Sequence, residues 1–462
     1  MFSWLKNPWK RSRGGRKAAD PSAPQIIPRS EHGISRQQIS DYALKVLYRL
    51  NQAGHEAYLV GGGVRDLLLG REPKDFDVAT SASPEEVRKL FRNCRLIGRR
   101  FRLAHVHFGR EIIEVATFRA AHDVDGDGTT SDNGMLLRDN VYGSLEEDAW
   151  RRDFTVNALY YTVSDFSVID HTGGLADLKA GQLRMIGDPQ QRFHEDPVRM
   201  LRAVRFAAKL GFRIEKEVET AIRELGYLLE EVSNARLFDE TLKLFLSGYG
   251  VASYELLRHY RLFGQLFPET DACLSEEQDH FPHTLLLRAL ENTDRRIAEG
   301  KPVTPAFLYA ALLWEPVRRE SLLLMRRKMP ALQAIQVAGD AVVARQLPRV
   351  QVPKRFSLQS REIWEWQERL ARSTGKRAQR LMEQPRFRAA YDFLLLRAES
   401  GEDLAELAEW WRALQESEPA AQAQLLRQTN RPAGLAPEAG DGPVKKKRRR
   451  RPRKRPAGPA TP

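Results

Sequence analysis

The sequence predicts an α/β head over residues 31–177, followed by a mostly α-helical neck and body, with disordered basic tails at both ends. Three observations support this fold class. Short apolar runs of strand length alternate with helical runs through the first part of the chain, as in α/β domains. From Asp196 to residue 415 the apolar residues recur at helical spacing. Both ends are rich in Lys, Arg, Pro and Gly and hold too few apolar residues to build a core.

The order of elements within the head follows from the apolar pattern and from the residues that break it. Residues 40–53 predict a helix, because apolar side chains recur on one face. Strands are predicted at 58–60, 75–79, 104–109 and 111–118. Three glycines follow the first strand and a helix begins directly after them, which predicts a strand–turn–helix unit.

Further segments complete the organisation of the chain. Residues 178–250 predict a helical neck and residues 251–417 a helical body, in which scattered prolines separate the helices. Residues 1–30 and 418–462 predict disordered ends.

The composition excludes several classes of protein. With 42% hydrophobic and 29% charged residues, the chain can build a core and dissolve in water. It has no run of the roughly 20 apolar residues that a membrane span needs, and no apolar run typical of a secretion signal. Cys94 and Cys273 are its two cysteines, too few for a disulfide framework or a thiolate metal cluster. We therefore expect a cytoplasmic protein, and nothing in the sequence demands more than a monomer.

Positive charge is concentrated at the two ends of the chain. The formal net charge is +13. Residues 445–455 hold ten basic residues and residues 1–17 hold six, both without an acidic residue, so the remainder carries about −3. Such runs usually bind a polyanion, although a solubilising end or an import signal has the same composition. We predict that the polyanion is bound by Lys445, Lys446, Lys447, Arg448, Arg449, Arg450 and Arg451.

A glycine turn and a pair of aspartates form the first candidate site. Gly61 and Gly62 lie between a predicted strand and a helix that contains Arg65. Free backbone amides at such a turn favour a phosphate. Side chains at i and i+2 of a strand face the same side, so Asp75 and Asp77 are expected to project together. Two carboxylates beside a phosphate site suit two Mg²⁺ ions, for which Mn²⁺ is a possible substitute.

These residues belong to a longer stretch that points to a known family. Residues 59–80, LVGGGVRDLLLGREPKDFDVAT, resemble the signature of the class II nucleotidyltransferases. Residues 151–161 (RRDFTVNALYY) and 195–212 (EDPVRMLRAVRFAAKLGF) are similar to the next two motifs, in the expected order. The family has a palm like that of DNA polymerase beta and includes bacterial poly(A) polymerases and CCA-adding enzymes. The resemblance implies template-independent addition of nucleotides to RNA 3′ ends with two metal ions.

The second motif supplies candidates for the sugar and phosphates of the nucleotide. Arginine suits phosphate because its guanidinium is always charged and donates hydrogen bonds as a fork. The resemblance implies that Arg152 and Asn157 hold the incoming nucleotide and that Asp153 is an active-site carboxylate. A third metal ligand is common in the superfamily, and both Asp153 and Glu114, on a neighbouring predicted strand, are candidates. Arg119 is a further candidate for contact with phosphate.

The third motif carries candidates for reading the base. Pro197 suits the first position of a helix, which makes Asp196 its N-cap. Arg199, Arg202 and Arg205 recur every third residue, so they share one helix face. The resemblance implies that Asp196 and Arg199 face the base edge, where a carboxylate accepts from an amine and a guanidinium donates to ring acceptors. Arg202 is included with them as a nucleotide-binding residue.

One segment separates the two branches of the family. Residues 96–106, LIGRRFRLAHV, resemble the stretch that marks bacterial poly(A) polymerases. The basic tail points the same way, because an enzyme that extends many RNAs gains from phosphate attraction that ignores sequence. We therefore predict polyadenylation of RNA 3′ ends from ATP, promoting RNA decay and processing, with RNA-decay proteins as further partners. A CCA-adding tRNA nucleotidyltransferase is the alternative, and a catalytically inactive RNA-binding adaptor is an alternative from another class.

Overall fold

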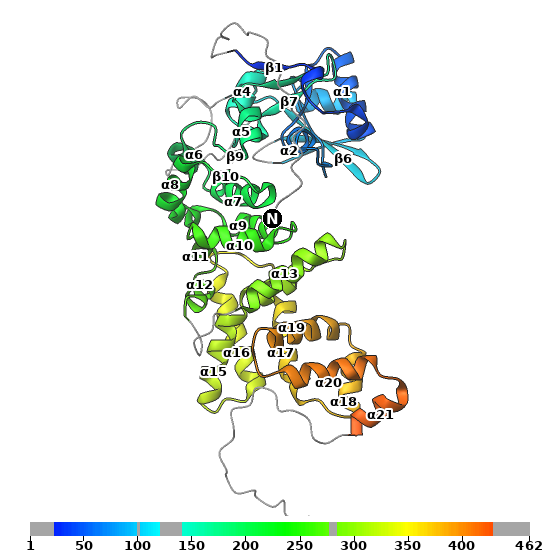
Figure 1. Cartoon of the computed structure of the whole chain (residues 1–462), viewed down its shortest axis with the longest axis vertical. Helices are drawn as coiled ribbons and strands as arrows, with labels where there is room; N and C mark the ends of the chain where they lie inside the picture. The colour runs from blue at the N-terminus through cyan, green and yellow to red at the C-terminus, as the bar shows by residue number, and fades with distance from the viewer. Residues whose placement is uncertain (1–22, 99–101, 121–140, 277–283, 428–462) are drawn as a thin grey trace, which may run out of the picture. The chain divides into compact units, whose positions relative to one another are not determined.

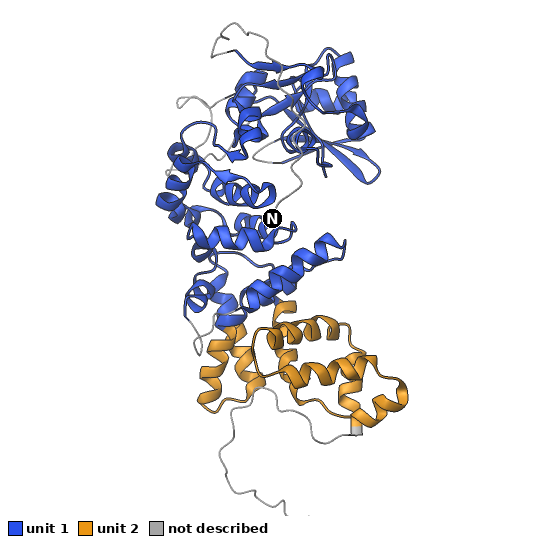
Figure 2. Cartoon of the chain, viewed as in Figure 1, with its two compact units in different colours: residues 1–316, 342–357 blue, residues 317–341, 358–462 orange. Residues whose placement is uncertain are grey.

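The computed structural model describes residues 23–98, 102–120, 141–276 and 284–427 (Figure 1). It confirms the predicted fold class, with a mixed sheet and its helices first and almost only helices afterwards. The chain divides into two compact units, residues 1–316 with 342–357 and residues 317–341 with 358–462 (Figure 2). No helix in the described part of the chain is long and apolar enough to cross a membrane.

The head is built on one eight-stranded sheet. In spatial order its strands are β1 (Gln25–Ile27), β8 (Val168–Asp170), β7 (Leu159–Tyr161), β2 (Ala57–Val60), β3 (Asp77–Thr80), β6 (Glu111–Thr117), β5 (Leu103–Phe108) and β4 (Cys94–Ile97). Neighbours run antiparallel except β3 and β6, which are parallel. Val60, the last residue of β2, pairs with Asp77, the first residue of β3. The centre of the sheet therefore brings the glycine turn and the aspartate pair side by side.

The two faces of the sheet are covered differently. Helices α1 (Asp41–Gln52) and α3 (Pro84–Leu90) contact the strands on one face, as Figure 1 shows for α1. The ring of Tyr42 in α1 stacks on that of Phe108 in β5 at 4.6 Å. On the opposite face, Leu145 and Ala149 of α4 (Leu145–Trp150) pack into a cluster that contains Ala79. Because Asp77 and Ala79 are two apart on one strand, Asp77 lies on this second face.

The neck belongs to the same compact unit as the head. After the 3-10 helix η3 (Thr155–Asn157) and the helix α5 (Gly174–Ala180), its elements are β9 (Gln182–Leu183), α6 (Pro189–Glu195), α7 (Val198–Leu210), β10 (Arg213–Ile214), α8 (Lys216–Leu225), η4 (Gly226–Glu231) and α9 (Asn234–Phe245). Leu201 and Val204 of α7 are fully buried, whereas the predicted arginine face of α7 keeps partial exposure. The helix ends at Gly211, whose φ of +73° is the left-handed conformation typical of a helix end.

The remaining helices form the body. They are α10 (Gly250–His259), α11 (Phe263–Leu266), α12 (Pro268–Leu274), α13 (Leu285–Ala298), α14 (Pro305–Leu312), α15 (Trp314–Arg326), α16 (Ala331–Gln346), α17 (Lys354–Arg372), α18 (Lys376–Met382), α19 (Phe387–Glu399), α20 (Ala405–Glu416) and α21 (Pro419–Arg427). In the second unit, Trp366, Phe387 and Trp411 belong to one buried cluster. This unit therefore has an apolar core of its own.

Several expectations are corrected at the level of single elements. Strand β1 and the turn η1 (Arg29–Glu31) lie within the range predicted to be a disordered N-terminal segment, and α21 lies within the predicted C-terminal tail. These short elements are stabilised by partners: β1 pairs with β8, and Leu425 and Leu426 of α21 pack against the core of the second unit. The strand predicted at 75–79 begins at Asp77, so Asp75 precedes it. The basic residues 445–451 lie outside the described residues.

Candidate active site

The glycine turn joins β2 to α2 (Gly62–Leu68). Gly61 has a φ of +72°, a left-handed conformation that residues with a side chain rarely adopt. A Cβ atom at Gly61 would also lie 3.6 Å from Nη1 of Arg152. The turn therefore places free backbone next to a guanidinium, as a phosphate site requires.

Arg152 is anchored with part of its guanidinium toward this turn. Its Nε donates to the hydroxyl of Tyr160 at 2.8 Å, and its Nη2 donates to the carboxylate of Asp148 at 2.9 Å. Burial lowers the pKa of Arg152, but Tyr160 and Asp148 outweigh burial and raise it above its usual value. The side chain is therefore a fixed cation beside Gly61.

Asp77 and Glu114 lie side by side on the parallel strands β3 and β6. Burial, followed by the charges of Glu114 and Asp75, raises the pKa of Asp77 from 3.8 to about 6. Oε2 of Glu114 is 3.2 Å from Nε2 of His105, on the next strand. Carboxylates that repel one another in this way mark a place where a cation would be stabilising.

The carboxylates do not form a closed metal cage. Within the described ranges, no three or more His, Cys, Asp or Glu side chains are grouped so that they could hold a metal ion. This arrangement still suits Mg²⁺, which is usually held by one or two protein carboxylates and completes its shell with water and substrate phosphates. The carboxylate oxygens of Asp75, Asp77 and Glu114 therefore fit a divalent metal by their donor chemistry.

Asp153 has a different environment from Asp77. Nε of Arg202 donates to its Oδ2 at 2.7 Å, and the backbone N of Phe154 donates to its Oδ1 at 2.9 Å. Burial raises the pKa of Asp153, but Arg202 outweighs burial and the pKa falls to about 2. The charge of Asp153 is thus already compensated by an arginine. Of the two candidates for the third metal carboxylate, the geometry favours Glu114.

Arg65 and Asn157 connect Asp153 to the glycine turn. Nη1 of Arg65 donates to Oδ1 of Asn157 at 2.6 Å, and Nδ2 of Asn157 donates to Asp153 at 3.3 Å. Nε and Nη2 of Arg65 donate to Asp66, and Arg65 is only 1% exposed. The guanidinium of Arg65 is therefore buried and bonded to Asp66 and Asn157, and its contact with the nucleotide stays a prediction.

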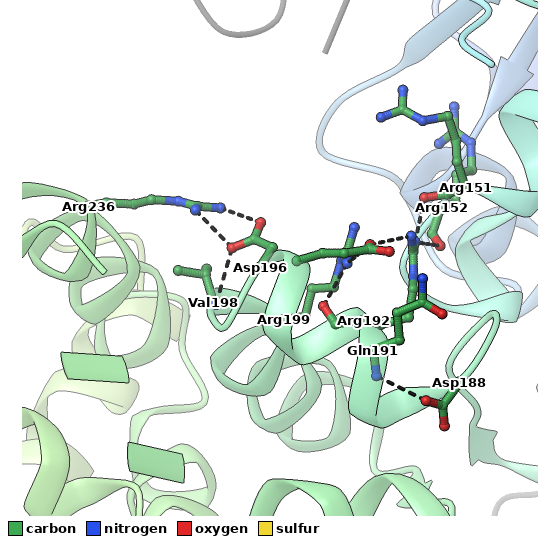
Figure 3. Close-up of polar contacts among 10 residues, drawn as sticks. Arg151, Arg152, Asp188, Gln191, Arg192, Asp196, Val198, Arg199 and Arg236 are labelled. Atoms are coloured by element: carbon green, nitrogen blue, oxygen red, sulfur yellow. Dashed lines mark hydrogen bonds and ion pairs between the residues drawn. The ribbon is translucent and has the colours of Figure 1, made fainter. Parts of the chain in front are cut away.

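A cluster of arginines surrounds the junction of head and neck. Its members are Arg119, Arg151, Arg152, Arg192 and Arg199, the last four of which are labelled in Figure 3. Burial, followed by repulsion from the other members, lowers the pKa of Arg151 to about 9. Burial and Arg199 lower the pKa of Arg192 to about 10. So many neighbouring cations favour an anion, and a triphosphate has the required charge and acceptor oxygens. Sequence reasoning included Arg151 in the second motif without assigning it a role, and it missed Arg192, which no motif spacing marks.

Asp196 is held by an arginine that the sequence analysis did not identify. Nη1 and Nη2 of Arg236 donate to its two oxygens at 2.8 and 2.7 Å (Figure 3). The backbone N of Val198, the first residue of α7, donates to Oδ1 of Asp196 at 3.3 Å. Arg236 lies on α9, far along the chain, so only the packing of α9 beside α7 brings it here.

Arg199 lies at the start of α7 beside the same network. Its Nη1 donates to Glu195 at 2.8 Å and to the carbonyl of Arg192 at 2.7 Å. Nη1 of Arg192 donates to the same oxygen of Glu195 at 2.8 Å. Of the two predicted base readers, Arg199 thus belongs to the arginine cluster and Asp196 lies near it, as Figure 3 shows.

Three parts of the chain match known protein families. Residues 57–184 match the family described as "Poly A polymerase head domain", residues 211–274 match "Probable RNA and SrmB- binding site of polymerase A", and residues 327–455 match "Polymerase A arginine-rich C-terminus". The chain is 52% identical over 437 residues to "Poly(A) polymerase I" of Salmonella typhimurium, which covers 93% of this chain and 92% of that relative. The chain belongs to the bacterial poly(A) polymerase family. Its relative in Haemophilus influenzae is 48% identical and covers 88% of this chain and 91% of that protein.

Membership of the poly(A) polymerase family confirms the predicted enzyme class, a polynucleotide adenylyltransferase. The alternative branch is related over a shorter part: a "CCA-adding enzyme" of Lactobacillus gasseri is 44% identical over 202 residues, which is 44% of this chain and 49% of that protein. A solved structure titled "tRNA-processing enzyme (apo form I)" is 22% identical, covers 86% of this chain and 99% of its own, and has a TM-score of 0.56. That likeness shows that the two chains share a fold.

Proposed function

We propose that this polymerase transfers AMP from ATP to the 3′ hydroxyl of RNA without a template and releases pyrophosphate, with two Mg²⁺ ions bound by Asp75, Asp77 and Glu114. One observation carries the proposal: Asp77 and Glu114 lie side by side on β3 and β6, and Arg152, a member of the arginine cluster, lies beside the glycine turn that follows the neighbouring strand β2. A metal–triphosphate complex supplies both the cation and the anion that these clusters favour.

Different residues of the site contribute to different parts of the reaction. When bound, the metal ions lower the pKa of the attacking hydroxyl and stabilise the leaving pyrophosphate. The backbone at Gly61 and Gly62 allows close approach of the phosphates, and Arg152 supplies a fixed charge beside them. Arg151 and Arg192 add to the positive potential. No covalent intermediate with the protein is needed, because positioning and charge stabilisation suffice for phosphoryl transfer.

Four residues act by positioning the residues that contact the nucleotide. Arg65, Asn157, Asp153 and Arg202 form a continuous hydrogen-bonded chain from α2 of the head to α7 of the neck. This chain joins the element that binds phosphate to the element that carries the base readers. Holding the two parts of one nucleotide in a fixed relation lowers the entropic cost of reaching the transition state.

Base selection is assigned to Asp196 and Arg199. Adenine presents an amine where guanine and uracil present a carbonyl, so a fixed carboxylate acceptor rejects both. An acceptor that faces a carbonyl instead costs about 1–3 kcal/mol, which corresponds to about 5- to 150-fold in rate. Cytosine shares the amine but is smaller, so CTP is expected to be the best of the wrong substrates.

The wider setting follows from charge and from the family. The helical body over residues 251–417 and the basic residues 445–451 bind the RNA, whose phosphates attract them regardless of sequence. We place the enzyme in the cytoplasm as a monomer that prepares RNA for decay and processing, in contact with RNA-decay proteins.

Incorporation of labelled nucleotides tests the proposal. Purified protein is incubated with Mg²⁺, an unstructured RNA with a free 3′ hydroxyl and each of the four nucleoside triphosphates in turn. Long tails from ATP are expected, with little product from GTP or UTP. Addition of CCA to a tRNA lacking it, followed by arrest, would instead support the CCA-adding alternative. Absence of incorporation from all four nucleotides would instead support the alternative of a catalytically inactive RNA-binding adaptor.

A further inference from the structure

We propose that the open face of strands β4, β5 and β6 binds the 3′-terminal nucleotide of the RNA, with the metal carboxylates along its inner edge. The proposal rests on the proposed function, because it names the surface that holds the second substrate of that reaction. It extends the active site from the centre of the sheet toward its edge.

Strand pairing places four polar residues in one row across the sheet. Asp77 pairs with Glu114, Glu114 pairs with His105, and His105 pairs with Arg95. Residues directly opposite each other on neighbouring strands share a face of the sheet. With strands about 4.8 Å apart, the row extends roughly 14 Å from Asp77 to Arg95. This length accommodates the terminal nucleotide next to the carboxylates and, farther along the row, the phosphate on the 5′ side of that nucleotide.

The same face is exposed and has the chemistry of an RNA surface. Along β5, Ala104 and Val106 are buried, whereas His105 and His107 alternate with them and remain partly exposed. Imidazole rings can stack on a base, and an arginine can bind the phosphate. Arg95 is exposed and makes no ion pair with any residue that the structure describes.

Exposed apolar side chains complete this surface. Ile97 on β4 is paired with Leu103, two residues before His105, and is 39% exposed. Ile112 on β6 is paired with His107 and is 43% exposed. Branched apolar side chains beside imidazoles and an arginine can pack against the flat face of a base and against the sugar, which removes apolar surface from water.

The geometry of the reaction indicates which of the two substrates binds to this face. The attacking hydroxyl and the leaving pyrophosphate lie on opposite sides of the reacting phosphorus, roughly in line. Gly61, with Arg152 beside it, follows β2 on one side of Asp77. Strands β6, β5 and β4 follow in order on the other side. The hydroxyl therefore approaches over Glu114, and the terminal nucleotide lies on the strands beyond it.

A double variant tests the surface without touching the metal ligands. Arg95→Gln with His107→Ala removes one charge and one ring from the outer part of the face, and neither residue is assigned to the metal site. The matched control is Arg88→Gln with Lys89→Gln, two exposed residues of α3 on the opposite face. With a short oligoadenylate as primer, the test variant should raise KM for RNA about 10-fold or more, because each stacked base contributes strongly to binding. kcat at saturating RNA and KM for ATP should stay within about two-fold, and the control should match the wild type.

Photo-crosslinking gives an independent measurement on the unmodified protein. RNA ending in 4-thiouridine is bound in the presence of a non-hydrolysable ATP analogue, and the crosslinked peptide is identified by mass spectrometry. Crosslinks within residues 94–97 or 103–107 support the proposal. Crosslinks elsewhere, for example in the groove beside Asp75 that Lys74 and Arg110 line, would overturn it, as would an unchanged KM for RNA. Because the wild type is assayed for AMP incorporation in parallel, failure of this surface is distinguishable from failure of the proposed function.

Discussion

Replacing Arg236 by Gln should weaken ATP use and reduce the preference for adenine. Arg236 donates to both oxygens of Asp196, and the Asp196 side chain is only 14% exposed. Hydrogen bonds to charged groups contribute about 1.5–3 kcal/mol each. The Arg236 side chain is 31% exposed and Gln keeps one donor group, so a net loss of about 1–3 kcal/mol is expected after screening. That loss corresponds to about 5- to 150-fold in kcat/KM for ATP.

The assay is kcat/KM for each of the four nucleoside triphosphates, with RNA saturating. Arg236→Lys should recover only part of the loss, because an ammonium cannot bridge both carboxylate oxygens as a guanidinium does. Lys243→Gln is the control, since Lys243 lies on the same helix and pairs with Glu240 rather than with Asp196. If Arg236→Gln folds normally and keeps the wild-type ratios of ATP use to GTP use and to UTP use, the assignment of Asp196 as a positioned base reader is refuted.

Three further predictions concern the metal site and the tail. Asp77→Ala should lower the rate of AMP incorporation about 10³-fold or more, and Glu114→Gln should lower that rate nearly as much. Asp153→Asn should mainly lower Tm. If Asp153→Asn lowers turnover more than Glu114→Gln does, Asp153 is the third metal ligand. Asp77→Asn should stabilise the metal-free protein above pH 6, because the pKa of Asp77 is raised from 3.8 to about 6 and its ionised form therefore opposes folding. The gain, at most roughly 3 kcal/mol, should vanish as the pH falls toward 4, and a pH-independent change in Tm would contradict the assigned cause. Deleting residues 445–462 should weaken RNA binding and flatten the dependence of log K on log salt without changing nucleotide choice, and an unaltered slope would show that the tail does not contact phosphates.

The chain order of the head could be predicted because its signals are local. The helix at α1 follows from apolar spacing, and the glycine turn before α2 follows from three consecutive glycines. By contrast, β1 is three residues long within a polar, Pro-rich end, and it is a strand only because β8 lies beside it. Helix α21 differs from β1, because it consists mostly of good helix formers, and its Leu425 and Leu426 are partly buried against the core of the second unit. Short elements with little intrinsic preference depend on tertiary partners, which no local pattern reports.

The candidate site likewise contains residues that local sequence predicts and residues whose roles depend on tertiary structure. The motifs predicted that Gly61, Asp77 and Arg152 belong to one site, and the structure brings these three residues close together. The roles of the remaining charged residues depend on which opposite charge lies nearest in space. Asp153 and Glu114 were equal candidates in the sequence, but Arg202 compensates the first, whereas the second lies beside Asp77.

The sequence by itself therefore determined the fold class and the family, and it predicted the location of the chemistry, since these depend on local pattern and on motifs of short spacing. Tertiary structure alone decided that Arg65 is buried, that Arg236 holds Asp196, and that, among the described residues, one face of β4, β5 and β6 keeps partly exposed side chains beside the carboxylates. The physical reason is that burial and charge compensation are set by neighbours brought together from distant parts of the chain, and electrostatic interactions depend on distance in space and on exposure to water.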